Sequence, residues 1–269
     1  MADAVLDAAF PNFSVFPLEP LLLAVFGVVH GVKRYGWVRL FVLFGIIFVV
    51  SNFFENLSVF TGFPFGNYHY TTGLGLELLS VPILVSLSYL GFSYVSWVLA
   101  SELVGDFFGK TGRLRVLFVP LVAAFMMGSW DVCFEPTLST VRGWWVWEQG
   151  GGYFGVPLSN FLGWILTAFV FFGLYAVYLR RSKAGLGAEA TFSRSFRFAP
   201  VFVFGGTTIG LAVQYLFRAN TLVVDGAGQF WQTSNIYEAA LITSVFMLLF
   251  VGILAAIRID QSKGRKGIG

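Results

Sequence analysis

The chain has 269 residues, of which 57% are hydrophobic and only 12% are charged. A water-soluble domain carries about 25% charged residues, because its surface must be solvated. This composition excludes a soluble globular protein and indicates one embedded in lipid. The net charge of +3 does not indicate nucleic-acid binding, since the basic residues lie in short loops and are not clustered on one face. We therefore expect no nucleic-acid partner.

Metal and redox cofactors are not expected either. The chain has one cysteine, Cys133, and two histidines, His30 and His69. So few thiol and imidazole groups exclude a disulfide framework, a multi-cysteine zinc or iron–sulfur site, and a haem held by stacked histidine pairs. No glycine-rich dinucleotide fingerprint follows a strand. We expect chemistry without a metal ion or another cofactor.

Seven apolar stretches are long enough to cross a bilayer, which takes about 20 residues. In chain order they cover residues 13–32, 37–54, 78–101, 116–134, 155–179, 198–217 and 237–257. Pro17 and Pro20 lie near the start of the first stretch. Without residues 13–16 this stretch is short for a membrane helix. The pattern predicts an all-α fold, in which residues 1–269 form one polytopic bundle of seven transmembrane helices.

The basic residues alternate between the connecting segments. Of the 17 Lys and Arg residues, only Arg142 and Arg218 fall on the same side of the membrane as the N-terminus, and the other fifteen fall on the opposite side. Cytoplasmic segments carry an excess of Lys and Arg. The split predicts an outside N-terminus and a cytoplasmic C-terminus in a multi-pass protein of the cell membrane.

Carboxylates gather at the predicted outer ends of the helices, beside loops rich in aromatic residues. Asp131 and Glu135 are four residues apart, so they share one face of a helix, and Glu55 lies on a polar stripe of the second helix with Asn52 and Asn56. A carboxylate near lipid is costly and normally faces the bundle interior or a cavity. We expect the two polar faces to meet at a similar depth.

Paired carboxylates in such a site rarely both ionise, so one keeps a proton while the other acts as a base. This arrangement suits proton transfer. Two alternatives stay open. The outer acids could instead bind loop backbones or pair with Arg142 and Arg218. Glu102 and Asp106, four apart at the inner end of the third helix, fit a solvated helix end or a second site.

Several motifs occur in order between residues 40 and 170: Glu55-Asn56, the loop from Thr61 to Tyr70, the segment from Asp131 to Pro136, and the segment from Tyr153 to Trp164. With these motifs the chain resembles the integral-membrane carotenoid biosynthesis family, which includes carotenoid hydratases of the bacterioruberin type and acyclic-carotenoid 1,2-hydratases. Glu135-Pro136 stands where the family pattern has Asp-Pro. The last two helices resemble the family only in hydropathy.

The resemblance implies that water is added to the terminal carbon–carbon double bond of an acyclic C40 or C50 carotenoid. An acid would protonate the alkene, and water would capture the tertiary carbocation. The expected catalytic residues are Glu55, Asp131 and Glu135. The expected substrate-binding residues are Asn56, Phe65, Tyr68, His69, Tyr70, Trp147, Tyr153, Asn160 and Trp164. Aromatic faces can stabilise a passing cation. The expected partners are the carotenoid, membrane lipid and other enzymes of carotenoid biosynthesis.

Other functions fit the sequence less well. A retinal protein would need a lysine in a membrane helix, and no predicted span contains one. A membrane prenyltransferase would need an Asp-rich motif for magnesium and diphosphate, and none occurs in or between the predicted helices. A carotenoid cyclase or isomerase would use the same protonation and exclude water. A carotenoid-binding protein or a proton-coupled transporter would place acids near mid-membrane and on both sides.

Overall fold

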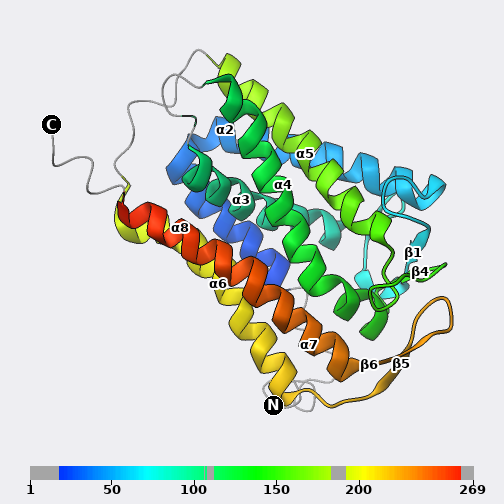
Figure 1. Cartoon of the computed structure of the whole chain (residues 1–269). Helices are drawn as coiled ribbons and strands as arrows, with labels where there is room; N and C mark the ends of the chain where they lie inside the picture. Colours follow the sequence, from blue (N-terminus) through cyan, green and yellow to red (C-terminus); the bar gives the residue numbers. More distant parts are fainter. Residues whose placement is uncertain (1–17, 106, 108–111, 183–191, 262–269) are drawn as a thin grey trace, which may run out of the picture.

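The protein is mostly helical in a computed structural model, which describes residues 18–105, 107, 112–182 and 192–261 (Figure 1). The helices are α2 (Leu18–Thr61), α3 (Ile83–Val104), α4 (Arg113–Pro136), α5 (Leu158–Arg181), α6 (Arg194–Phe217), α7 (Thr233–Ser244) and α8 (Phe250–Gln261). Two π-helical turns, Thr137–Val141 and Val245–Leu249, extend α4 and join α7 to α8. A short 3₁₀ turn covers Thr72–Leu74.

Within the described residues, six helices are long and apolar enough to cross a membrane, with α7 and α8 forming one continuous helix. This confirms a helical bundle of membrane-spanning dimensions. The number of crossings and the orientation of the ends remain predictions. The beginning of the first predicted helix, residues 13–17, lies outside the described residues.

The longest helix, α2, is bent back on itself at Gly36, whose φ of 77° and ψ of 164° are not helical. A Cβ atom at Gly31 would lie 2.6 Å from Cδ1 of Leu40, and one at Gly27 would lie 3.2 Å from Cζ of Phe44. These contacts place the two arms of α2 antiparallel. The second arm ends at Thr61 and not near residue 54 as predicted, so the polar stripe that includes Glu55 lies within the helix and not at its end.

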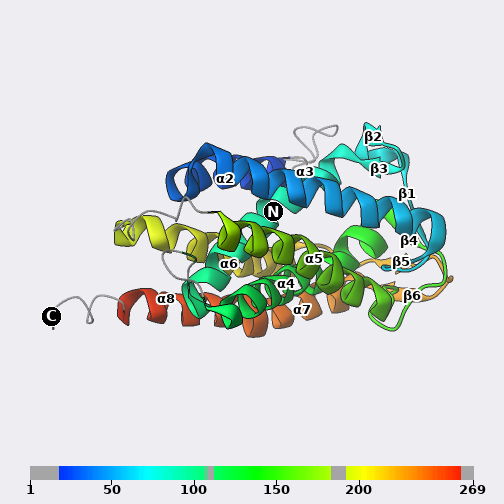
Figure 2. The ribbon, with the colours of Figure 1, turned by 90° about the horizontal axis from the view of Figure 1, so that it is seen from above.

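Three short antiparallel strand pairs lie at one end of the bundle, which we call the strand end (Figure 2). They are β1 (Tyr68–Tyr70) with β4 (Trp145–Trp147), β2 (Glu77–Leu78) with β3 (Val81–Pro82), and β5 (Leu222–Val224) with β6 (Phe230–Gln232). The prediction of an all-α fold missed these strands. Strands of two or three residues carry too little alternation to be recognised, and β1 and β4 are far apart in sequence.

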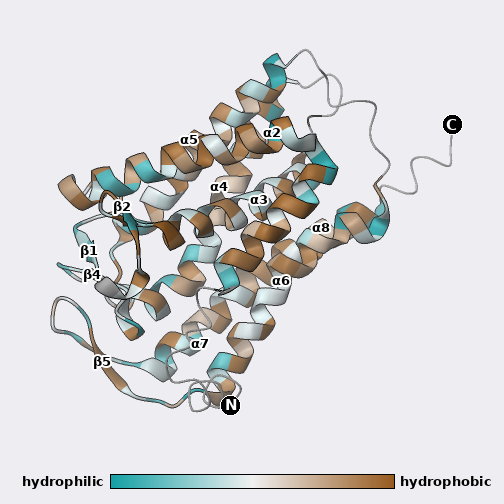
Figure 3. Cartoon of the chain, turned by 180° about the vertical axis from the view of Figure 1, so that it is seen from behind, coloured by the Kyte–Doolittle hydropathy of each residue, from teal (hydrophilic) through white to brown (hydrophobic). Residues whose placement is uncertain are grey.

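The centre of the bundle is formed by α3, which packs against α2, α4, α6 and α8. Figure 2 shows α2 along one face of the molecule and α7 and α8 along the opposite face. The large core side chains Trp97, Phe171, Phe172 and Tyr175 are fully buried. Many other large apolar side chains, such as that of Phe41, are exposed on the helices, and Figure 3 shows hydrophobic residues along most of their length. Such a surface suits lipid.

Close packing of α3 on α2 requires a glycine at position 91. A Cβ atom there would lie 2.5 Å from Cβ of Leu23 and 2.8 Å from its carbonyl carbon. We expect Gly91→Ala to destabilise the protein by about 1–3 kcal/mol, because the backbone of α2 must move. Thermal unfolding in detergent measures this. Gly45→Ala is the control, since no side chain or distant backbone lies within 4 Å of its Cβ position. Equal stability of the two variants would contradict this packing.

Candidate active site

Three acids converge at the strand end, and we call them the carboxyl cluster: Glu55 on α2, and Asp131 and Glu135 on α4. Their residues are only 5%, 8% and 3% exposed. Electrostatic interactions link Asp131 with both Glu135 and Glu55. The structure therefore brings together the two polar helix faces that the sequence analysis identified.

Glu55 is surrounded by tyrosine hydroxyl groups from two elements. Its Oε2 accepts hydrogen bonds from Tyr68 and, at 3.0 Å, from Tyr70, both on β1. Its Oε1 accepts a 2.6 Å hydrogen bond from Tyr89 on α3. Burial and the nearby Glu55 raise the pKa of Tyr68 and Tyr70 well above the ordinary value. Both phenols of β1 therefore keep their protons and can act as hydrogen-bond donors.

Glu135 is held by two indole groups from β4. Its Oε1 accepts a 2.6 Å hydrogen bond from Nε1 of Trp145 and a 2.7 Å hydrogen bond from Nε1 of Trp147. The α-helix ends at Pro136, directly after this residue, and continues as a π-helical turn. An indole N–H can only donate. Oε1 of Glu135 is therefore a pure acceptor in this arrangement.

Asp131 lies one turn before Glu135 and is bound by the start of α5. Its Oδ2 accepts a 2.6 Å hydrogen bond from Nδ2 of Asn160. Pro157 precedes α5 in an extended conformation, so the helix begins where Asn160 can reach α4. Asn160, which the sequence analysis placed at the site, contacts the carboxyl cluster directly.

The pairing of β1 with β4 explains which aromatic residues face the acids. Tyr68 lies opposite Trp147 and Tyr70 lies opposite Trp145, while His69 lies opposite Val146. Successive side chains of a strand point to opposite faces. His69 consequently points away from the carboxyl cluster: its side chain is 56% exposed, and its Nδ1 lies 3.4 Å from Oε1 of Glu148. The structure does not bring His69 to the site.

Aromatic rings line the carboxyl cluster. The Tyr68 and Trp147 ring centroids are 4.8 Å apart, and the rings of Tyr89 and Trp164 stack at 4.5 Å with an interplanar angle of 11°. Phe65 is buried, with its ring 6.2 Å from that of Trp164. The helices α3 and α5, the strands β1 and β4 and the loop that contains Phe65 thus contribute aromatic rings to one region.

Two other predicted substrate-binding residues have supporting positions. Asn56 donates from Nδ2 to the backbone oxygen of Asn52 at 2.8 Å, and its Oδ1 accepts from the backbone N–H of Ser80 at 3.0 Å. It therefore fixes the turn between β2 and β3. The hydroxyl group of Tyr153 donates to the backbone oxygen of Val132 at 3.2 Å, which ties the loop after β4 to α4.

Two further residues contact the acids and were not predicted from the sequence. Tyr89 lies in the apolar stretch 78–101, where nothing in the sequence distinguishes it from a core residue. Trp145 could have been predicted, because it lies two residues before Trp147 and therefore shares its face in a strand.

The partners of the carboxyl cluster are all neutral. In the described part of the chain, the three acids accept hydrogen bonds from tyrosine, tryptophan and asparagine side chains. In the same part of the chain, no group of three or more His, Cys, Asp or Glu side chains is arranged to hold a metal ion. The arrangement can hold or transfer protons.

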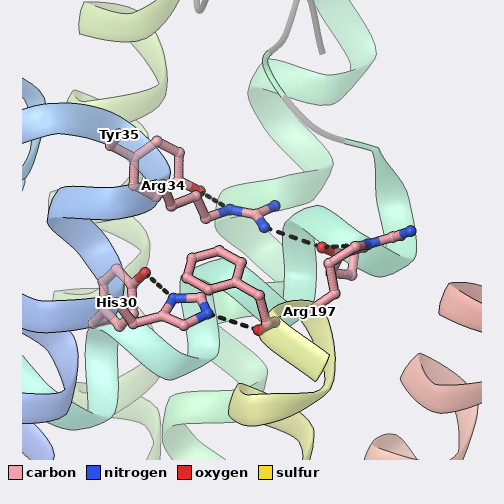
Figure 4. Close-up of polar contacts among 7 residues, drawn as sticks. His30, Arg34, Tyr35 and Arg197 are labelled. Carbon is pink, nitrogen blue, oxygen red and sulfur yellow. Dashed lines mark hydrogen bonds and ion pairs between the residues drawn. The ribbon is translucent and has the colours of Figure 1, made fainter. Parts of the chain in front are cut away.

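At the opposite end of the bundle, Glu102 is held by two arginines, as Figure 4 shows for Arg34 and Arg197. Nη1 of Arg34 lies 3.1 Å from Oε1 of Glu102, and Nη2 of Arg197 lies 2.5 Å from Oε2. Glu102 is thus the centre of an ion-pair group that joins α2, α3 and α6. Asp106, its predicted companion, lies outside the described residues.

His30 is part of this same end. Its Nε2 donates to the backbone oxygen of Phe196 at 2.9 Å, so its Nδ1 can accept from the hydroxyl group of Tyr94 at 2.5 Å. Its ring stacks on that of Phe196 at 3.8 Å. Both ring nitrogens are used in joining α2 to α3 and α6.

We expect Glu102→Ala to lower the stability of the protein by roughly 3 kcal/mol, because two arginines in a largely buried position lose their counter-charge. Thermal unfolding in detergent measures the loss. Asp260→Ala is the control, since its ion pair with Arg194 is exposed and should contribute little. A stable Glu102→Ala protein would show that this ion-pair group does not hold α2, α3 and α6 together.

Comparison with known proteins adds independent information. Residues 15–227 match the sequence profile of a family described as "Carotenoid biosynthesis protein", and this range includes the whole carboxyl cluster. Over 117 residues the chain is 29% identical to the bisanhydrobacterioruberin hydratase of Haloarcula japonica. That alignment covers 43% of this chain and 38% of the hydratase, so it spans less than half of the length of this relative. No solved structure matches the chain.

Proposed function

Because this chain belongs to the carotenoid biosynthesis protein family, we propose that it adds water to the terminal double bond of an acyclic carotenoid. The observation that carries the proposal is the carboxyl cluster: three buried acids with neutral partners, enclosed by tyrosine and tryptophan side chains. The partial similarity to a hydratase supports the same reaction. The protein would be a hydro-lyase that needs no cofactor.

The proposed reaction begins when a carboxylic acid of the cluster gives its proton to the less substituted carbon of the terminal alkene. A tertiary carbocation forms at the neighbouring, methyl-bearing carbon. The carboxylates and the faces of Tyr68, Tyr89, Trp147 and Trp164 would stabilise this cation electrostatically. Water then attacks the cation, loses a proton to a carboxylate, and leaves a tertiary alcohol.

The test is to express the chain in bacteria that make an acyclic carotenoid, and to analyse the pigments by mass spectrometry. The proposal expects products heavier by one or two molecules of water. A cyclised or isomerised product of unchanged mass would favour the alternative carotenoid cyclase or isomerase. Unchanged substrate would favour a carotenoid-binding protein or a transporter. Purified protein that has been treated with a chelator and desalted should retain hydration; loss that one metal ion restores would refute the cofactor-free scheme.

We also propose that the bundle crosses the cell membrane seven times, with the strand end outside. Each arm of α2 would then be one crossing, and the loops near Arg181 and the C-terminus would be cytoplasmic. Reporter fusions placed at the N-terminus and after Arg181 should report opposite sides, with the second inside. A fusion after Arg181 that reports the outside would contradict this orientation and the outer position of the carboxyl cluster.

A further inference from the structure

The hydrogen-bond partners of the three acids differ, and from this difference we infer a division of roles. We propose that Asp131 is the acid that protonates the carotenoid, that Glu135 is the base that takes a proton from water, and that Trp145 and Trp147 impose this division. The inference rests on the proposed hydration reaction and specifies how its site works.

Of the two acids on α4, Glu135 is the one more strongly stabilised as an anion. Both indole N–H groups are directed at the same oxygen, at 2.6 Å and 2.7 Å, and neither group can accept a proton in return. Hydrogen bonds to a charged acceptor are roughly twice as strong as those between neutral groups, so the two indoles favour the ionised form. The register of β1 with β4 holds both indoles at this oxygen.

Asp131 is the acid that keeps the proton shared with Glu135. It is four residues before Glu135 on α4 and interacts with it electrostatically, so one of the two carboxyl groups is expected to keep a proton. Apart from its hydrogen-bonding contact with Glu135, Asp131 accepts a hydrogen bond from the amide of Asn160, against the two indole bonds that Glu135 accepts. The proton of the pair therefore belongs on Asp131.

Glu55 is less suited to be the donor. Its two oxygens together accept hydrogen bonds from three tyrosine hydroxyl groups, which leaves little room for a carotenoid to approach a proton on either oxygen. As an anion it would instead stabilise the positive charge that forms on the substrate. This gives each acid one task.

The proposed cycle begins and ends with a protonated Asp131. Asp131 transfers its proton to the alkene carbon, where a new C–H bond forms as the double bond breaks and the adjacent carbon becomes cationic. Water forms a C–O bond to this carbon and gives its extra proton to Glu135. The proton then moves from Glu135 to Asp131, because the indoles favour the anion at Glu135. The net change is addition of one water molecule.

Other titratable groups lie near Asp131 and have to stay unchanged when its role is tested. Those in electrostatic contact with Asp131 are Glu55, Glu135, Tyr89, Cys133 and Tyr153. None of these groups is a cation. The variants below leave all of them unchanged except the acid or indole under test.

Proton exchange in heavy water separates protonation from water capture. In E135Q, Asp131 should still hold a proton, because burial disfavours a charged carboxylate. In heavy water it delivers a deuteron to the alkene, and the poorly captured carbocation then loses a hydrogen from the same carbon back to Asp131. The recovered, unhydrated carotenoid should therefore contain deuterium at its terminal alkene. In D131N the recovered carotenoid should contain none. Both amides keep the shape of the acids, and the amide oxygen in E135Q can still accept the indole bonds. Folding is checked by thermal unfolding.

A failure of the proposed function and a failure of the division of roles would give different results. Wild-type protein that neither hydrates nor exchanges would refute the proposed function itself. Wild-type hydration combined with exchange in D131N, or with no exchange in E135Q, would overturn the division of roles while leaving the function intact.

The double variant W145F/W147F tests the positioning role of the indoles, because phenylalanine keeps an aromatic face and removes the N–H donor. Without the donors Glu135 should hold a proton more readily. The low-pH limb of the hydration pH–rate profile should then move to higher pH. A purely structural role would lower the rate at all pH values without moving that limb, and this result would overturn the positioning role.

Discussion

Replacing Asp131 by asparagine should lower the rate of carotenoid hydration by about 10²- to 10⁴-fold, the usual cost of removing a general acid. The amide can still accept the hydrogen bond from Asn160 and has nearly the same volume, so folding and carotenoid binding should survive. Hydration by purified protein in detergent, followed by chromatography of the pigments, measures the loss.

The matched control for Asp131→Asn is Glu148→Gln, which also removes a carboxylate at the strand end. Glu148 directly follows Trp147 but is exposed, with its carboxylate near His69 and away from the carboxyl cluster. The control should hydrate at nearly the wild-type rate. An Asp131→Asn protein with normal folding and a near-normal rate would show that the carboxyl cluster has a structural role only.

Glu55→Gln should lower the hydration rate by about 10²- to 10³-fold, which is the typical loss when one group that stabilises transition-state charge is removed. The physical reason is the loss of a buried negative charge beside the developing carbocation. The hydroxyl groups of Tyr68, Tyr70 and Tyr89 would then face a neutral amide. The rate should fall while carotenoid binding, measured by pigment retention on the purified protein, changes little.

Tyr89→Phe provides a graded comparison for Glu55→Gln. It removes one of the three hydroxyl donors and keeps the ring that stacks on Trp164, so we expect a smaller loss of rate than for Glu55→Gln. Glu77→Gln, which alters an exposed acid on β2, serves as the control. Equal rates for wild type and Glu55→Gln would exclude an electrostatic role for Glu55.

Much of the fold could be predicted because membrane helices are specified by long apolar stretches. The predicted break between the first two helices falls at Gly36, where the structure turns α2 back. The predicted end of the second arm was wrong because the polar residues Asn52, Glu55 and Asn56 lower the hydropathy there, although their side chains are buried. Hydropathy reports contact with lipid, not the position where a helix ends.

The acids of the site were predictable, but their partners were only partly so. Asp131 and Glu135 share a helix face through their spacing alone. Tyr89 could not be identified, because its role depends on how α3 lies beside α2. His69 was expected at the site because it lies in the outer loop that carries the family motif, and the strand register turns it to the other face. Tertiary packing and strand pairing, which are not local properties, decided both cases.

The most direct test of the central claim is hydration of a purified acyclic carotenoid by purified protein in water labelled with heavy oxygen, with no metal ion or nucleotide added. The account predicts a tertiary alcohol whose new hydroxyl oxygen carries the label, formed by wild type and strongly reduced in the Asp131→Asn variant. An active wild-type protein that yields only unlabelled products of unchanged mass would contradict the account, because the cation would then form without being captured by water.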